Sequence, residues 1–161
     1  MDPHPADETP DAPSIPSAIL SLRNLARKLM SRTILLAASL PAPPGQLFDM
    51  YLDADTHGAF TGSAVTISAT PGTPFRAFDG ALTGTMLQVV PRRLIVQSWR
   101  STQWGPDDPD SSLILTFVPE DGGGRIELVQ VNVVDKDFAG VCHGWEKFYW
   151  APWRAYLARR S

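Results

Sequence analysis

The feature that most constrains this chain is a long amphipathic segment near its C-terminus, preceded by a series of short segments rich in β-forming residues. Between residues 138 and 160, apolar side chains recur at helical spacing and polar side chains occupy the opposite side. A helix with so wide an apolar face has to lie across a large hydrophobic surface. Pro152 should bend this helix or break it near residues 148–151. The residues expected on the apolar face are Val141, Trp145, Phe148, Tyr149, Pro152 and Tyr156.

The segments before this helix predict antiparallel strands. Turn sequences such as Asp79-Gly80 and Gly122–Gly124 separate most of them. A short helix is expected from Pro44, and residues 53–62 form either an irregular loop or a broken second helix. The sequence therefore predicts an α+β fold, in which a curved antiparallel sheet of about six to seven strands wraps around the long C-terminal helix. The expected strands cover residues 33–40, 65–69, 75–78, 81–89, 94–100, 112–118 and 126–134.

The N-terminal 32 residues differ in composition from the rest of the chain. Residues 1–16 contain five prolines, four acidic residues and no Lys or Arg, which predicts a disordered tail. Residues 17–32 form a basic lead-in segment with leucines at helical spacing. Three alternatives are open: an amphipathic helix that touches an anionic surface or a partner, a short helix packed on the domain expected over residues 33–161, or a weakly ordered lead-in. Its four basic residues, with no acidic one, are Arg23, Arg27, Lys28 and Arg32.

Composition excludes several classes of protein. With 43% hydrophobic and 19% charged residues, the chain has enough apolar side chains for a core and is not fully disordered. A net charge of −3 argues against a protein built to bind nucleic-acid phosphates. No stretch approaches the roughly 20 apolar residues of a membrane span, and the apolar run at residues 34–38 begins too late for a signal peptide. We therefore expect a cytoplasmic protein that has no membrane span and binds no nucleic acid.

The chain contains few of the side-chain combinations that catalysis or metal binding needs. Asp53, Asp55 and His57 could form a metal cluster, but a solvated loop of acidic residues is the simpler interpretation. Cys142 is the single cysteine and is expected to be a small buried apolar residue. Neither a phosphate-binding glycine pattern nor a nucleophile elbow occurs. These observations predict a protein that is not an enzyme and holds no cofactor or metal.

The aromatic residues are the remaining candidates for function. Trp and Tyr combine a large apolar area with a polar group, so they are typical of cavities and partner surfaces. Alternatively, they fill the space between the helix and the sheet, and we expect this of most of them. The candidates for lining a ligand cavity are Phe60, Phe78, Trp99, Trp104, Trp145 and Tyr149.

A series of short motifs runs along the domain. In chain order they are Phe75-Arg76-Ala77-Phe78-Asp79-Gly80, Gly84, Val90-Pro91, Leu94-Ile95-Val96, Trp99-Arg100, Trp104 with Pro106, Ser112-Leu113 with Leu115 and Phe117, Gly144-Trp145 and Tyr149-Trp150. In this order they resemble the C-terminal domain of the activator-of-Hsp90-ATPase family, over about residues 33–160. The resemblance implies the helix-grip fold of START domains and the SRPBCC superfamily, which agrees with the fold predicted from the pattern.

The resemblance also implies a function. It points to a non-enzymatic binding module that acts as a co-chaperone-like or stress-related protein, or holds a small hydrophobic ligand between the sheet and the C-terminal helix. The implied partners are an Hsp90-type chaperone and a small hydrophobic molecule. In the eukaryotic co-chaperone, a separate N-terminal domain acts together with this one on the chaperone. The alternative is a cavity enzyme, cyclase- or hydrolase-like, which needs an ionisable group facing the cavity.

Overall fold

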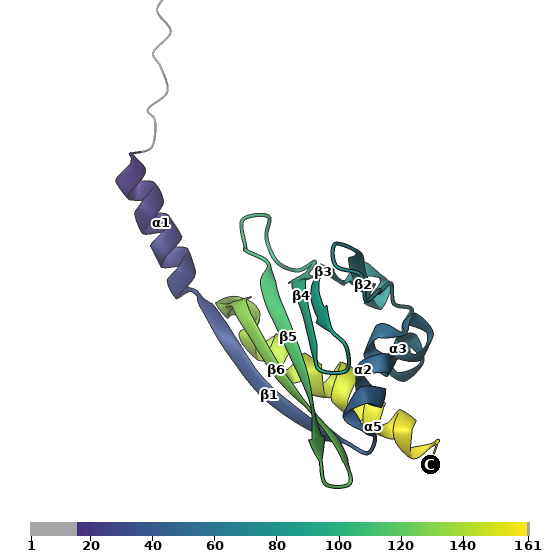
Figure 1. Cartoon of the computed structure of the whole chain (residues 1–161). Helices are drawn as coiled ribbons and strands as arrows, with labels where there is room; N and C mark the ends of the chain where they lie inside the picture. Colours follow the sequence, from purple (N-terminus) through teal and green to yellow (C-terminus); the bar gives the residue numbers. More distant parts are fainter. Residues whose placement is uncertain (1–15, 161) are drawn as a thin grey trace, which may run out of the picture.

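A computed structural model describes residues 16–160 of the chain, as a curved sheet, a long C-terminal helix and three shorter helices (Figure 1). The helices before the sheet hairpins are α1 (Ser17–Leu29), α2 (Pro44–Leu52) and α3 (Ala54–Thr61). The strands are β1 (Ser31–Leu40), β2 (Pro74–Ala77), β3 (Leu82–Val90), β4 (Leu94–Ser101), β5 (Ser111–Glu120) and β6 (Gly123–Val134). The C-terminal helix consists of α4 (Phe138–Trp145), a π-helical turn η3 (Glu146–Trp150) and α5 (Ala151–Ala158), and short 3-10 turns occur at Phe78–Gly80 and Asp135–Asp137.

All six strands pair antiparallel in one sheet, in the order β1-β6-β5-β4-β3-β2. Consecutive strands β2 to β6 are joined as neighbours, and β1 lies beside the last strand, with Ile34 opposite Gln130 and Leu40 opposite Gly124. The sheet curves around the C-terminal helix, which crosses it in yellow in Figure 1. This is the predicted α+β helix-grip architecture, with six strands.

The inner face of the sheet supplies half of the core. Along β4, β5 and β6, buried and partly exposed residues alternate, because successive side chains of a strand point to opposite faces. The buried set includes Ile95, Leu113, Leu115, Ile126 and Leu128, each at most 1% exposed. These aliphatic side chains face the aromatic side of the C-terminal helix.

The C-terminal helix runs without a break from Phe138 to Ala158, with helical backbone angles at both junctions of its π turn. The break expected near Pro152 is wrong, because the helix continues through a widened turn just before this proline. Proline has no N–H and its ring clashes with the carbonyl four residues earlier, so a π turn just before it relieves the conflict. The same turn corrects the predicted face: Trp153 and Leu157 are buried, whereas Phe148 is 47% exposed.

The buried face of the C-terminal helix is a stripe of residues spaced four apart. In an α-helix such a stripe drifts by about 40° per step, so it would leave the sheet within a few turns. The extra residue of the π turn takes up part of this drift, and after the turn Trp153 stacks on Phe60 of α3. The stripe is Val141, Trp145, Tyr149, Trp153 and Leu157, all buried.

Two further expectations differ from the structure, and one open alternative is decided by it. The strand predicted at residues 65–69 is wrong, because only an isolated bridge between Thr66 and Arg76 forms there. Residues 53–62 form the helix α3, so the helical alternative was the right one. Strand β1 begins at Ser31, two residues before the predicted start. The tail expected over residues 1–16 lies outside the described residues except for Pro16.

Within residues 16–160, none of the helices combines the length and the apolar character that crossing a bilayer would need.

Candidate functional site

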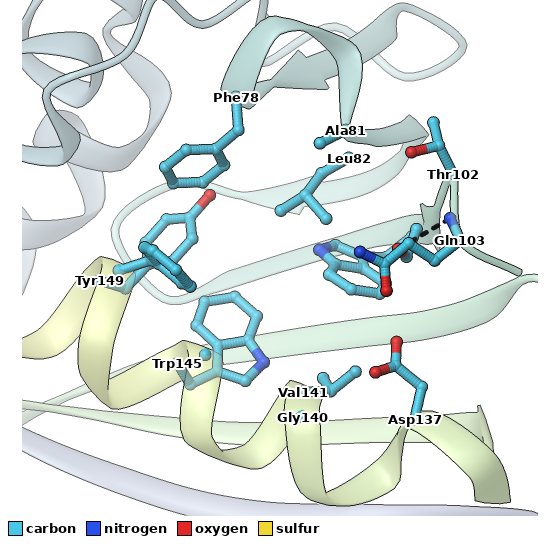
Figure 2. Close-up of a pocket in the computed structure, with 14 residues that line it drawn as sticks. Phe78, Ala81, Leu82, Thr102, Gln103, Asp137, Gly140, Val141, Trp145 and Tyr149 are labelled. Carbon is cyan, nitrogen blue, oxygen red and sulfur yellow. Dashed lines mark hydrogen bonds between the residues drawn. The ribbon is translucent and has the colours of Figure 1, made fainter.

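A cavity of about 430 Å³ lies between the sheet and the first half of the C-terminal helix (Figure 2). The turn before β3 contributes Phe78 and Ala81, and β3 itself contributes Leu82. The far wall is the helix, from which Trp145 and Tyr149 project toward Phe78 and Leu82 in Figure 2. The complete lining is Phe78, Ala81, Leu82, Trp99, Ser101, Thr102, Gln103, Asp137, Gly140, Val141, Gly144, Trp145, Phe148 and Tyr149.

Four of the six candidate residues lie in this lining: Phe78, Trp99, Trp145 and Tyr149. Phe60 is absent from it, because it lies deeper in the core, stacked on Trp153 with ring centroids 4.2 Å apart. Trp104 is also absent from it and packs against Trp99, with centroids 5.4 Å apart. The two missing residues therefore support the cavity wall from outside the lining.

Trp145 is held in place by a buried chain of hydrogen bonds. Its Nε1 donates to Gln130 Oε1 at 3.0 Å, and Gln130 Nε2 donates to Ser111 Oγ at 2.9 Å. The Ser111 hydroxyl in turn donates to the backbone carbonyl of Trp99 at 2.8 Å. Gln130 and Ser111 have no exposed surface, so this chain ties the Trp145 indole to the Trp99 backbone without help from solvent.

A buried His–Tyr pair stands behind the other end of the lining. His57 Nδ1 lies 2.7 Å from the Tyr51 carbonyl oxygen, and His57 Nε2 lies 3.3 Å from the Tyr149 hydroxyl. Because a carbonyl only accepts, Nδ1 carries the ring proton, and the Tyr149 hydroxyl donates to Nε2. Each of the three side chains is at most 3% exposed.

Burial keeps this pair uncharged at neutral pH. Desolvation lowers the pKa of His57 to about 4, although the hydrogen bond to the Tyr51 carbonyl acts in the opposite direction. Burial raises the pKa of Tyr149, and it also raises that of Tyr51. At this end of the cavity Tyr149 therefore carries a neutral hydroxyl, which donates its hydrogen bond to His57.

The opposite end of the cavity is more polar. There Asp137 and Gln103 meet, and Figure 2 places Asp137 on the helix side and Gln103 on the sheet side. Trp104 Nε1 donates to Asp137 Oδ2 at 2.7 Å, which orients the carboxylate. Asp137 and Tyr149 are the two ionisable side chains in the lining, one at each end.

The loop that carries Gln103 and Trp104 is held by charged groups. Arg100 donates to the carbonyl oxygens of Asp108 and Gly105 and to the Asp110 carboxylate. Lys136 Nζ lies 2.6 Å from Asp108 Oδ2. That hydrogen bond, with one from the Gly105 N–H, lowers the pKa of Asp108. These contacts tie the loop to the start of the C-terminal helix.

Both interpretations of the Asp53, Asp55 and His57 group are corrected by the structure. Asp53 caps α3 by accepting from the Thr56 N–H at 2.9 Å, and His57 is fully buried on that helix, so the segment is not a solvated loop. Among residues 16–160, no group of three or more potential ligands is arranged to hold a metal ion. Sequence reasoning missed His57 because a helical position facing the core looks like a loop residue when its neighbours are acidic.

Cys142 is also different from the prediction, since it is only partly buried. Partial burial raises the pKa of its thiol. It lies beside the buried stripe of the helix and is not in the cavity lining.

The curved sheet, the helix laid across it and the aromatic cavity between them define the class of the protein: it is a helix-grip protein of the START-like type. Residues 41–158 match the family model described as "Activator of Hsp90 ATPase homolog 1-like protein". The chain therefore belongs to this family.

Curated relatives and solved structures agree with the assignment. The human activator of 90 kDa heat shock protein ATPase homolog 1 is 25% identical over 122 residues, which cover 76% of this chain and 36% of the relative. The Dictyostelium discoideum homolog is 26% identical over 123 residues, 75% of this chain and 32% of the relative. The chain thus spans about a third of the length of these curated relatives.

Two solved structures support the fold. An Hsp90 activator from Plasmodium falciparum matches with a TM-score of 0.67 and 21% identity, covering 80% of this chain and 96% of that one. Protein MLL2253 from Mesorhizobium loti matches with a TM-score of 0.70 and 19% identity, covering 81% and 99%.

Proposed function

We propose that this protein is a non-enzymatic binding module that holds a small, largely apolar molecule in the cavity between its sheet and its C-terminal helix. The observation that supports this most directly is the cavity itself. Its volume of about 430 Å³ falls in the usual range for small-molecule sites, and its walls are mostly aromatic and aliphatic. The few polar groups stand at its two ends, as in sites where they orient an otherwise apolar ligand.

The rigidity of the walls also supports the proposal. Trp145 is fixed by its hydrogen bond to Gln130, Trp99 packs against Trp104, and Tyr149 is fixed by His57. A preformed cavity does not have to order its side chains when a ligand binds, so less binding free energy is lost. Walls that were free to collapse would close an unfilled apolar space.

A substitution that fills the cavity tests the proposal. Gly144 belongs to the lining, and a Cβ built there meets only Phe148 Cδ2, at 3.7 Å, which is an ordinary contact. We expect Gly144→Leu to occupy the cavity and leave the fold intact. Ala139→Leu is the matched control, because Ala139 is exposed on the same helix and outside the lining.

The probe is N-phenyl-1-naphthylamine, an uncharged aromatic amine that becomes fluorescent in apolar surroundings. We expect it to bind the wild type and Ala139→Leu equally, and Gly144→Leu at least tenfold more weakly, with thermal unfolding showing all three folded. Equal binding by a folded Gly144→Leu protein would refute the cavity as the site. Absence of binding to the wild type would refute the proposal for molecules of this kind.

A second candidate function is favoured by the comparisons: association with an Hsp90-type chaperone. The curated relatives are named as activators of the ATPase of the 90 kDa heat shock protein, and this chain corresponds to about a third of their length. The test is the steady-state ATPase rate of an Hsp90-type chaperone with this protein in excess. A several-fold stimulation supports a co-chaperone role, and an unchanged rate together with no complex on size-exclusion chromatography contradicts it.

A further inference from the structure

Helix α1 stands away from the rest of the molecule with its apolar side chains in solvent. Figure 1 shows it, in purple, projecting beyond the end of β1 and clear of the sheet and the other helices. Ile19 is 46% exposed, Leu22 64% and Leu25 55%. Met30, at the base of the helix, is 65% exposed. These exposures contradict the alternative in which the helix packs on the domain.

The helix is amphipathic. At 100° per residue, the positions of Ile19, Leu22 and Leu25 fall within an arc of about 120°, with alanines between them. Arg23, Arg27 and Lys28 occupy positions outside that arc, and the helix contains no acidic residue. An apolar stripe bordered by cations, with low overall hydrophobicity, is the pattern of helices that lie in the plane of a membrane surface.

The base of the helix is anchored to the segment that precedes the C-terminal helix. The Asp135 N–H donates to the Met30 carbonyl at 2.9 Å. The next basic residue, Arg32, already belongs to the domain, because its guanidinium lies 3.5 Å from the centre of the Phe138 ring and 3.6 Å from Asp135 Oδ1. Arg32 is therefore engaged by the domain, and the cations available to a partner of α1 are those within Ser17–Leu29 itself.

We propose that α1 docks the protein on an anionic lipid bilayer, with its apolar stripe in the headgroup region and its cations next to the lipid phosphates. Lysine and arginine stems can extend along the apolar surface and leave their charges at the headgroup level. Each such cation adds attraction to an anionic leaflet, and salt screens it. This inference concerns a surface separate from the cavity and stands whether or not the cavity binds a ligand.

The charges of α1 favour an anionic bilayer over a second copy of the chain as the partner of its apolar stripe. Two α1 helices packed face to face would bring cations together, with no acidic side chain on either helix to compensate them. Residues 33–161 carry ten basic and thirteen acidic side chains, so this part of the chain supplies no net positive charge for binding anionic lipid. A helix that projects from the domain meets the bilayer while the acidic domain stays at a distance.

The test is flotation of the full chain with vesicles of phosphatidylcholine alone or with about a third phosphatidylserine, at low and high salt. Leu22→Ser with Leu25→Ser removes two exposed leucines of the stripe. Leu35→Ser is the matched control, because Leu35 is 72% exposed but lies on β1. Arg23→Glu with Lys28→Glu tests the charge.

We expect the wild type and Leu35→Ser to bind anionic vesicles at least tenfold more than neutral ones, less so at high salt. The leucine variant and the charge variant should each lose at least tenfold, with unchanged thermal unfolding and unchanged N-phenyl-1-naphthylamine binding. Wild-type protein that fails to float with anionic vesicles, or leucine variants that float as well as the wild type, would overturn the proposal. So would a wild-type dimer in light scattering that the leucine variant dissociates, because the stripe would then bind a second copy.

Discussion

The buried His57 makes a sharp prediction about stability and pH. Its imidazole is fully enclosed, its Nδ1 donates to the Tyr51 carbonyl and its Nε2 accepts from the Tyr149 hydroxyl. Protonation at Nε2 would place a charge in the core and set an N–H against the hydroxyl proton of Tyr149. The native state therefore resists protonation, and the pKa of His57 falls to about 4 because of burial.

The size of this loss in stability follows from the linkage between proton binding and folding. An unfolded histidine titrates near 6.5, so between pH 6.5 and 4 the unfolded chain binds more protons than the native protein, and stability falls as the pH falls. At about 1.36 kcal/mol per pH unit, the free energy of unfolding should drop by about 3 kcal/mol across this window from this residue alone. That is a large part of the roughly 5–15 kcal/mol by which domains are stable.

Urea unfolding at a series of pH values between 7.5 and 4.5 measures this effect. His57→Gln removes the titration but keeps an amide N–H that can donate to the Tyr51 carbonyl, so its stability should be lower at pH 7.5 and less dependent on pH. His143→Gln is the matched control, because His143 is exposed on the C-terminal helix. Acidic groups such as Asp108 act equally in all three proteins and cancel in the comparison.

The reasoning is refuted if the free energy of unfolding of His57→Gln falls with pH as steeply as that of the wild type between pH 7.5 and 4.5. A native-state imidazole resonance of His57 that titrates near 6.5 in an NMR experiment would refute it as well.

Four further substitutions probe the walls of the cavity and the sheet. Trp145→Phe leaves the buried Gln130 Oε1 without its donor, so we expect a loss of about 1–3 kcal/mol in urea unfolding, and little further loss when Gln130→Leu removes the acceptor as well. Gly84→Ala places a Cβ 1.9 Å from the Ser98 backbone oxygen, which forces β3 and β4 apart, so we expect a loss of about 1–3 kcal/mol or more. Gly144→Ala, with only an ordinary contact at 3.7 Å, should leave the melting temperature unchanged or raise it, and an equal loss in both glycine variants would contradict the steric argument.

The sheet and the C-terminal helix were predictable because their signals are local. Alternation over residues such as Leu113, Leu115 and Phe117 marks which side of a strand is buried, and helical spacing after Phe138 marks a helix with one apolar face. The strand predicted at residues 65–69 is wrong, because the backbone of this segment forms only a single bridge, to Arg76 at the edge of the sheet.

The cavity was predictable only in part. Aromatic content pointed to Phe78, Trp99, Trp145 and Tyr149, which do line it, but could not separate them from Trp104, which packs behind Trp99. Polar and small lining residues such as Asp137 could not be predicted from composition, because their place in the lining depends on which residues of other elements lie across the cavity.

The sequence by itself determined the six strands of the sheet, the C-terminal helix, their order, the family and the amphipathic character of α1, because periodicity and motif order are properties of neighbouring residues. Only the tertiary structure decided that His57 is buried against Tyr149, that Trp153, after the π turn, stacks on Phe60 of α3, and that a cavity stays open beside Trp145. The physical reason is that these features arise where residues far apart in the chain meet. Burial, hydrogen-bond partners and unfilled volume are set by those long-range contacts.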